Sequence, residues 1–280
     1  MDFIKKGFDS FELKILALIF MTFDHVAYFM TGIIEIPSWF NIIGRIAAPI
    51  FIFMVANGYY YTKSKTGYMK RLYLWSVFMS IANSLANSYI PHPKGAMVIN
   101  NIFATMFYIV FFLYFIDKLK SGIKEKNKKN IIVPILLFIM VIVLQIGMFS
   151  ILMNPTLEVS RIALMVAMIF LPTPLMVEGS IIFIILGLGF YYCLNSKKKT
   201  AIFYLALCIL YFVVAVLPAG LTIENLFLIN EQWLMILALP FILLYNRQKG
   251  RGMKYLFYIY YPAHVYGLLL LSRVIYGMVK

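Results

Sequence analysis

Charged side chains are scarce in this sequence. They make up 13% of its 280 residues, whereas hydrophobic residues make up 63%. Soluble globular domains carry about 25% charged and about 45–50% apolar residues. The shortage of charge therefore excludes an ordinary soluble globule and predicts a membrane protein built from apolar helices.

Cysteine and histidine are also rare. The chain has three histidines and two cysteines, and both cysteines, Cys193 and Cys208, lie within apolar runs. No group of Cys and His residues has the spacing of metal ligands, so the sequence predicts neither a disulfide framework nor a zinc site. We expect the two cysteines to be packing residues and expect no metal cofactor.

Acidic residues are outnumbered by basic ones, which gives a net charge of +14. A basic protein can bind nucleic acid, but short basic loops between apolar runs are also what the positive-inside rule predicts for a membrane protein. The sequence shows no internal repeat and no heptad array, and the lysine-rich stretch 118–130 is read as a solvated connector. We therefore expect no nucleic-acid partner, and one membrane domain over residues 1–280.

Apolar runs near the roughly 20 residues needed to cross a bilayer recur along the chain. The expected spans are residues 11–32, 39–61, 71–90, 97–116, 131–152, 177–195, 200–217, 228–246 and 255–278. Another apolar segment, 160–176, is interrupted by Pro172 and Pro174. The predicted fold is an all-α, polytopic transmembrane helical bundle.

The basic residues set the expected topology. Five clusters hold 20 of the 25 basic residues, at 5–14, 63–71, 118–129, 197–199 and 247–254. All five lie on the cytoplasmic side only if 160–176 does not cross the membrane. This predicts about nine spans, a cytoplasmic N-terminus and an outer C-terminus, with ten spans as the alternative. Because broken backbone at membrane depth must be surrounded by protein or water, we expect 160–176 to be re-entrant or outward-lying and to line the polar site.

Two ionisable residues lie deep in the first apolar run. Asp24 and His25 lie about 15 Å along the helix from Lys14, which we place near the inner interface. An ionised Asp at a helix centre costs roughly 2.5–3.5 kcal/mol on translocon scales, so Asp24 needs a partner or a water-filled cavity. Arg45, about 9 Å below Trp39 in the second run, reaches the same level, and we predict an Asp24–Arg45 ion pair. Adjacent helical residues do not face each other, so Asp24 and His25 should have different roles.

His264 is the second histidine expected at this depth. It lies about 15 Å from Lys254 along the last run, which matches the depth of His25. Pro262 frees a backbone carbonyl in the same helix, a kind of break that lines cavities rather than facing lipid. A lone buried histidine is more often a packed core residue, and the matched depth makes a functional role as plausible as that reading.

Three further polar residues are weaker candidates. Asn83 in the third run is expected to form interhelical hydrogen bonds. Asn101 opens the fourth run, and Glu178 begins the span after the broken segment, where it could line an outer vestibule or simply be interfacial. His92 is expected to be an exposed loop residue.

Basic residues gather at the expected cytoplasmic ends of the first and third runs. Clustered cations can hold phosphates. Lys14 and Arg71 each begin a span that continues into the polar layer, whereas the positive-inside rule alone accounts for Lys70.

Motifs at both ends of the chain occur together in a specific combination. They are Lys14 with Asp24-His25, Gly44-Arg45-Ile46-Ala47-Ala48-Pro49-Ile50-Phe51, Tyr68-Met69-Lys70-Arg71-Leu72, Asn101-Ile102-Phe103-Ala104-Thr105, Tyr245-Asn246 and Phe257-Tyr258-Ile259-Tyr260-Tyr261-Pro262-Ala263-His264. Together they resemble the TraX family of bacterial multi-pass membrane proteins. The resemblance covers both ends of the chain and has no counterpart for 153–176.

The resemblance implies a membrane acyltransferase. TraX of conjugative plasmids is associated with acetylation of the pilin N-terminus, and the family is similar to membrane enzymes that acetylate cell-surface glycans. Those enzymes carry a Lys or Arg, ten residues and then a His on their first span, and Lys14 and His25 have that spacing. The implied donor is cytoplasmic acetyl-CoA. The implied acceptor, a pilin-like N-terminus or a surface glycan or polymer, is reached from the outer side of the bacterial cell membrane.

The residues and the resemblance together give a predicted site. The candidates are His25, Asp24, Arg45 and His264 for catalysis, Lys14, Arg71 and Lys70 for binding CoA phosphates, and Asn83, Asn101 and Glu178 for orienting substrate. The imidazole of His25 could act as a general base on the acceptor or accept the acetyl group itself. Asp24 is expected to supply a structural charge, and His264 or Asn83 a hydrogen bond that orients an imidazole or polarises the thioester.

Two other readings fit the same polar residues. In a proton-coupled transporter or flippase, Asp24, His25, Arg45 and His264 would form a titrating relay. In a non-catalytic membrane assembly protein, they would only hold helices together.

Overall fold

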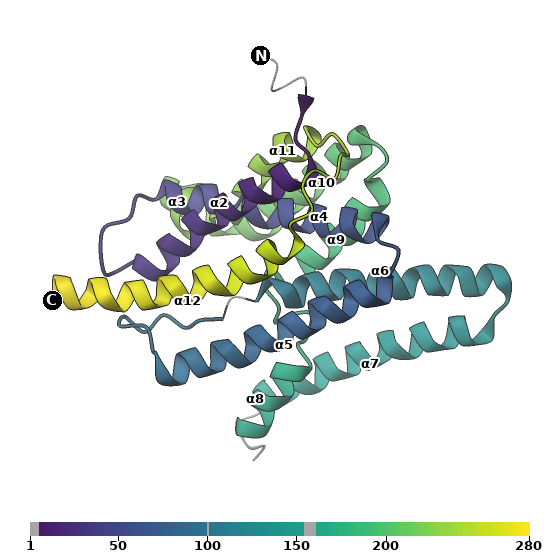
Figure 1. Cartoon of the computed structure of the whole chain (residues 1–280), viewed down its shortest axis with the longest axis horizontal. Coiled ribbons are helices and arrows are strands. Elements are labelled where there is room, and N and C mark those ends of the chain that lie inside the picture. The colour runs from purple at the N-terminus through teal and green to yellow at the C-terminus, as the bar shows by residue number, and fades with distance from the viewer. Residues whose placement is uncertain (1–5, 100, 154–160) are drawn as a thin grey trace. The chain divides into compact units, whose positions relative to one another are not determined.

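Helices make up nearly all regular structure in the computed structural model, which describes residues 6–99, 101–153 and 161–280 (Figure 1). An isolated bridge pairs Phe8 with Tyr245, and no strand occurs within those ranges. The predicted all-α class is confirmed. Lys5, in the first basic cluster, and residue 160, at the start of the expected broken segment, lie outside the described residues.

The chain divides into two compact units, which are described separately. The first combines the described residues of 1–57 with 83–98 and 189–280, and the second combines 58–82 with the described residues of 99–188. Helices α4 (Ala47–Tyr61), α5 (Lys65–Tyr89) and α9 (Ser180–Cys193) contribute residues to both units. The expectation of one membrane domain over the whole chain stays a prediction.

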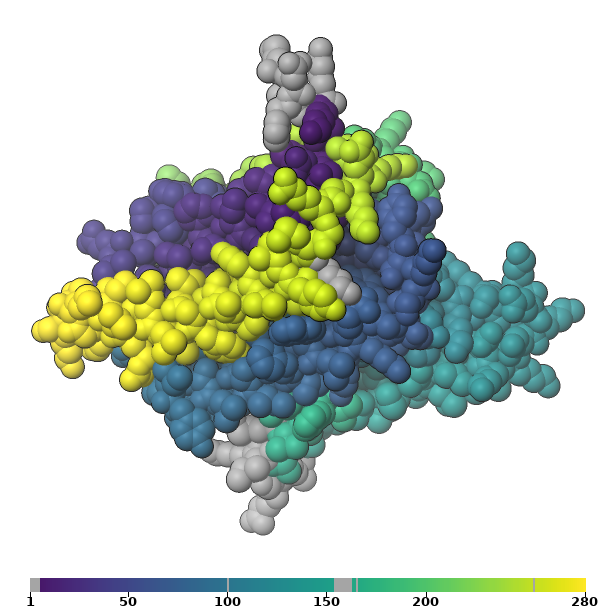
Figure 2. Space-filling model, in the orientation of Figure 1, coloured from purple at the N-terminus to yellow at the C-terminus, as the bar shows by residue number. Residues whose placement is uncertain are grey.

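The first unit is built around α2 (Ser10–Met30). Asp9 caps this helix: its carboxylate accepts from the backbone N–H groups of Phe11 and Glu12, and the Glu12 side chain accepts from the backbone N–H of Asp9. This capping box fixes the start of the helix. Helix α12 (Lys254–Val279) lies along α2 on one face of the molecule (Figure 2).

Shorter elements complete the first unit. They are α3 (Trp39–Gly44), α10 (Lys197–Tyr211), α11 (Leu239–Leu243), π-helical turns at Phe212–Val216 and Asn225–Ile229, and 3-10 segments at Leu217–Ala219 and Glu231–Ala238. Aromatic rings form part of the core, where Phe53 of α4 lies 5.3 Å from Phe190 and 5.6 Å from Tyr245, centroid to centroid. Both cysteines are free thiols, and Cys208 is buried.

The second unit contains a long helical hairpin of α6 (Ile102–Glu125) and α7 (Lys128–Met153), followed by α8 (Arg161–Phe170) (Figure 1). Its core is formed by Ala104, Tyr108, Phe111, Phe115, Val141, Val177 and Ile184. More than half of the residues of α7 are exposed, and most of these exposed side chains are apolar. A lipid-facing span has this pattern, since lipid takes the place of a protein partner.

Among the described residues, six helical stretches are long and apolar enough to cross a membrane. They are Ser10–Met30, Trp39–Tyr61, Ile102–Glu125, Lys128–Met153, Lys197–Ala219 and Tyr255–Val279. Each overlaps an expected span. The largest difference is in α6, which begins at Ile102 rather than at residue 97 and continues to Glu125, so that part of the stretch 118–130 is helical rather than a connector. The expected spans at 177–195 and 228–246 contain the shorter apolar helices Ser180–Cys193 and Glu231–Leu243. The expected span at 71–90 lies in α5, which is a continuous helix but is not among the six.

The proline-interrupted segment is broken where the sequence places the break. Helix α8 ends at Phe170, and residues 171–179 are not helical. Neighbouring side chains form hydrogen bonds with backbone groups that have no helical partner at the break. Tyr73 donates to Phe170 O, Tyr108 to Pro172 O and Thr105 to Glu178 O, while Leu175 N donates to Gln145 Oε1. The break is thus surrounded by protein, as membrane depth requires. That it lines the polar site stays a prediction.

Replacing Tyr108 with phenylalanine should loosen this segment. The variant leaves Pro172 O without its donor, which costs about 1–3 kcal/mol for a buried carbonyl. The free energy of unfolding in mixed micelles measures the loss. Tyr114→Phe is the control, because the Tyr114 ring contacts Phe115 while its hydroxyl forms no hydrogen bond within the described ranges. Equal stability of the two variants would show that the Tyr108 hydroxyl does not hold the segment.

Candidate functional site

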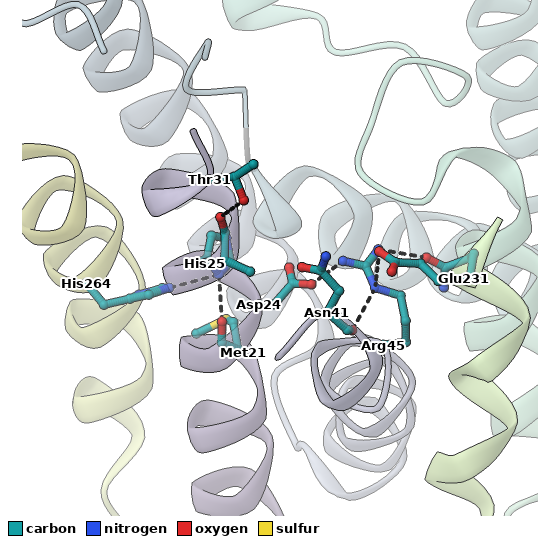
Figure 3. Close-up of polar contacts among 10 residues, drawn as sticks. Met21, Asp24, His25, Thr31, Asn41, Arg45, Glu231 and His264 are labelled. Carbon is teal, nitrogen blue, oxygen red and sulfur yellow. Dashed lines mark hydrogen bonds and ion pairs between the residues drawn. The ribbon is translucent and has the colours of Figure 1, made fainter. Parts of the chain in front are cut away.

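Two adjacent polar residues near the middle of α2, Asp24 and His25, point in different directions. Asp24 points toward Arg45, whereas His25 points toward His264 of α12, on the other side of α2 (Figure 3). His25 is only 2% exposed, and the Asp24 side chain is 22% exposed. The structure therefore contains two separate polar clusters, as expected for adjacent residues of a helix, and the roles expected for them stay predictions.

Asp24 and Arg45 form the predicted ion pair. Arg45 Nη2 donates to Asp24 Oδ1. The close approach depends on Gly44, because a Cβ atom there would lie 2.3 Å from Asp24 Oδ1. The pairing prediction is confirmed, and it explains why a glycine precedes Arg45.

Arg45 has further partners that the sequence did not predict. Its Nη1 donates to Gln232 Oε1 at 3.2 Å, and its Nε donates to Asn41 O at 3.4 Å. The same Nε lies 3.8 Å from Glu231 Oε1. Two carboxylates therefore share one guanidinium group. The sequence did contain one indication of this contact, because Glu231 is a charged residue inside the expected apolar span 228–246.

His25 and His264 form a hydrogen-bonded pair. His264 Nε2 lies 3.2 Å from His25 Nδ1, and the ring centroids are 4.7 Å apart. The shared depth expected for the two histidines is confirmed by this contact. Each Nδ1 also lies 2.9 Å from the carbonyl four residues earlier, Met21 O for His25 and Tyr260 O for His264.

These carbonyls fix the tautomers of neutral rings. A carbonyl can only accept, so each Nδ1 carries a proton. His264 Nε2 then has a lone pair and accepts from His25 Nδ1. His25 Nε2 also has a lone pair, and this atom is buried without a hydrogen-bond partner among the described residues. A buried, unpartnered basic nitrogen can take a proton from a nucleophile or attack an acyl group.

A seam of contacts joins α2 and α12. Lys14 Nζ lies 5.3 Å from the centroid of the Phe257 ring, and Thr22 Oγ1 lies 2.6 Å from the Tyr260 hydroxyl. The His25–His264 contact continues the seam. Lys14 and His25 are eleven residues apart, close to three full turns, and so lie on the same face of α2. The seam thus carries a cation at one end and the histidine pair at mid-helix.

Asn83 and His92 also belong to the first unit. Asn83 Oδ1 accepts from the Tyr266 hydroxyl at 2.8 Å, so Asn83 forms the expected interhelical hydrogen bond, and its expected role in orienting substrate stays a prediction. The expectation that His92 is exposed is wrong: it is 5% exposed, and its Nε2 lies 2.8 Å from Phe29 O. The free carbonyl near the end of α2 draws this loop residue inward.

The basic candidates of the second unit lie on α5. Lys70 is exposed. Arg71 places its guanidinium carbon 5.9 Å from the centroid of the Tyr68 ring, and its Nε is buried without a hydrogen-bond partner among the described residues. Their expected role in binding phosphate stays a prediction.

The polar candidates of the second unit, Asn101 and Glu178, form hydrogen bonds with neighbouring helices. Asn101 Nδ2 donates to Ser76 O and Ser80 Oγ, both at 2.9 Å. The backbone carbonyl of Glu178 accepts from Thr105 Oγ1 at 2.6 Å. These contacts tie helices and the broken segment together, and the expected substrate-orienting role stays a prediction.

Comparison with known proteins identifies a family. A family model described as TraX protein matches residues 10–159 and 154–272, which together cover most of the chain. No curated protein and no solved structure matches. The matched ranges include both polar clusters and the seam between α2 and α12. They also include 153–176, so the expectation that this segment has no counterpart in the family is wrong.

Proposed function

Because the chain belongs to the TraX protein family, we propose that it is an integral membrane acyltransferase that transfers an acetyl group from acetyl-CoA to an acceptor. One observation carries this proposal: His25 Nε2 is a buried lone pair without a partner among the described residues, and Met21 O and His264 fix its tautomer. A purely structural histidine would be expected to use both nitrogens, since buried polar atoms are normally hydrogen-bonded.

The chemistry follows from that lone pair. His25 Nε2 takes the proton of an acceptor hydroxyl or amine as its oxygen or nitrogen attacks the thioester carbonyl carbon. The carbon–sulfur bond breaks, the CoA sulfur leaves as thiolate, and the imidazolium returns the proton to it. In the alternative route, Nε2 attacks the carbonyl carbon itself and the carbon–sulfur bond breaks to release the CoA thiolate. The acceptor then attacks the acetyl-imidazolium, the bond between the acetyl group and Nε2 breaks, and the acceptor proton passes to the thiolate. Both routes need the same free nitrogen.

We assign the CoA phosphates to Lys14 at the end of the seam. Its ammonium group has no carboxylate partner among the described residues, so a bound phosphate would supply a counter-charge. About 15 Å separates Lys14 from His25 along α2, a distance that an extended pantetheine arm can bridge. We also predict that Lys70 and Arg71 of the second unit bind CoA phosphates.

The proposed acceptor is a pilin-like N-terminus or a surface glycan or polymer, reached from the outer side of a bacterial cell membrane. This orientation requires the cytoplasmic N-terminus and about nine crossings favoured by the basic clusters. In that arrangement the apolar helices Ser180–Cys193 and Glu231–Leu243, together with α5, also cross the membrane, while α8 does not.

Cysteine labelling tests this topology. In a variant with Cys193 and Cys208 replaced by alanine, a cysteine introduced at exposed Lys198 should react only with reagents that reach the cytoplasm. A cysteine at exposed Glu35 should react only from outside. Labelling of position 198 from outside would favour ten crossings over nine.

Transfer is tested with full-length protein in lipid nanodiscs. Acetyl-CoA is added with extracted surface polymer or with a peptide bearing a free N-terminus, and release of the CoA thiol is followed together with the acetylated product by mass spectrometry. Acceptor-dependent thiol release is the expected result. In parallel, an acetylated surface molecule should vanish when the gene is deleted. Movement of substrate across proteoliposomes without acetyl-CoA would instead support a transporter.

A further inference from the structure

Tyr260 of α12 contacts His264 in two ways. The two rings are stacked, with centroids 5.1 Å apart and planes 15° apart. The backbone carbonyl of Tyr260 also accepts from His264 Nδ1 at 2.9 Å. Both contacts follow from the spacing of four residues, which places the two side chains on neighbouring turns of one helix face. One residue thus fixes both a face and a nitrogen of the His264 imidazole.

The hydroxyl group of Tyr260 ties its ring to α2. It lies 2.6 Å from Thr22 Oγ1, which in turn lies 2.8 Å from Leu18 O. A carbonyl can only accept, and a threonine hydroxyl has a single proton, so Thr22 donates that proton to Leu18 O. Tyr260 must therefore be the donor in its bond to Thr22. The far end of the tyrosine ring is anchored one turn before His25.

The rest of the His264 ring is enclosed as well. The ring of Tyr261 meets it edge-on, with centroids 5.5 Å apart and planes 70° apart, and His264 is only 9% exposed. Its Nε2 faces His25 Nδ1 at 3.2 Å (Figure 3). Turning the imidazole over would break both this contact and the bond to the Tyr260 carbonyl. His264 is therefore held in the one orientation that presents a lone pair to His25.

This orientation matters in the proposed transfer because His25 gains positive charge when its Nε2 takes a proton or an acetyl group. The charge makes its Nδ1–H a stronger donor, so the bonds to Met21 O and to His264 Nε2 strengthen as the reaction proceeds. An interaction that strengthens only as charge develops raises kcat and leaves the binding of acetyl-CoA unchanged. His264 thus acts on the reaction through His25.

We propose that Tyr260 is a positioning residue for acyl transfer, which holds the His264 ring so that its Nε2 accepts from His25 Nδ1. Tyr260 does not act as an acid on the reacting atoms, because its hydroxyl proton is donated to Thr22. The effect on rate rests on the proposed function of His25. The hydrogen bond between the two histidines can be measured without any transfer.

Solid-state NMR of full-length protein in lipid bilayers tests the positioning directly. With 15N-labelled histidine, an N–H···N hydrogen bond gives a scalar coupling between its two nitrogens, and the chain has only three histidines to assign. Native protein and Tyr260→Phe, which keeps the ring, should both show coupling between His25 Nδ1 and His264 Nε2. Tyr260→Leu, which removes the ring, should lose it.

Tyr276→Leu is the matched control for this measurement. It removes another tyrosine ring of α12, one that lies against Lys94 and Lys280 and not against a histidine. The coupling should persist in this variant. A coupling that is absent from native protein, or unchanged in Tyr260→Leu, would overturn the proposal.

Rates of transfer in lipid nanodiscs separate the ring of Tyr260 from its hydroxyl group. Tyr260→Leu should lower kcat about tenfold, near the upper limit for the loss of one aromatic pair, and leave the KM for acetyl-CoA unchanged. Tyr260→Phe should stay within a few fold of native protein, because it loses only a hydrogen bond. An equal loss of kcat in both variants would assign the effect to the hydroxyl group and contradict a role of the ring.

The double variant of Tyr260→Leu with His264→Ala shows whether Tyr260 acts through His264. Residues that act through the same contact are not additive, so kcat should fall about tenfold, no further than in His264→Ala alone. A loss of about 100-fold, the product of two independent effects, would contradict the proposal. If native protein shows the coupling but transfers no acetyl group, the proposed function fails, whereas the role of Tyr260 in holding His264 stands.

Discussion

Replacing His25 with alanine lowers the rate of acetyl transfer by about 100-fold to 10,000-fold, the range that a positioned general base contributes. A methyl group can neither hold a proton nor carry an acetyl group, so both routes through Nε2 are lost. The KM for acetyl-CoA should change little, because the proposed phosphate contact at Lys14 lies about 15 Å away. Release of the CoA thiol at saturating acetyl-CoA measures the loss.

Thr22→Val is the matched control for this experiment. Thr22 contacts Tyr260 one turn before the histidine pair, so the variant weakens the same seam between α2 and α12 without removing an imidazole. It should keep its rate within a few fold. His264→Ala should lower the rate about tenfold, an effect between those of the other two variants, because Met21 O still holds the proton on His25 Nδ1. If Thr22→Val and His25→Ala lost activity equally, the histidine would be holding helices together and not reacting.

Much of the helical framework could be predicted from apolar runs alone, because six of the expected spans are helices of sufficient length. The break before Pro172 was predictable for the same local reason, since proline cannot continue a helix. The hydrogen bonds that hold the broken segment in place could not be predicted. Tyr73 and Tyr108 are two of 20 tyrosines, and only the packing of α5 and α6 brings their hydroxyls to the free carbonyls.

The sequence predicted the depth of the polar residues along their helices but not how each helix is rotated about its axis. Rise per residue placed Arg45 level with Asp24 and His264 level with His25, and both contacts occur. Which nitrogen of His25 remains free depends on how α2 and α12 are turned about their axes, which no residue count supplies. Glu231 was missed because a carboxylate near the start of an apolar run is usually interfacial, and its contact with Arg45 joins residues far apart in the sequence.

Replacing Arg45 with alanine should destabilise the protein more than any other single change in the ion-pair cluster. The variant leaves Asp24 and Glu231 without their shared cation. Removing one partner of a buried ion pair costs about 3–5 kcal/mol, and we expect about 3 kcal/mol here because the side chains of this cluster retain some exposure. The midpoint and free energy of unfolding in mixed micelles measure the effect. Arg273→Met removes an exposed arginine of α12 and should cost less than about 1 kcal/mol.

Compensating substitutions can show why Arg45→Ala loses stability. If uncompensated carboxylates cause it, then Arg45→Met combined with Asp24→Asn and Glu231→Gln should recover most of the stability, because a neutral cluster has no charge left to bury. A triple variant as unstable as Arg45→Ala would instead assign the loss to the contacts of the Arg45 side chain with Asn41 and Gln232. Asp24 would then matter for packing and not for charge.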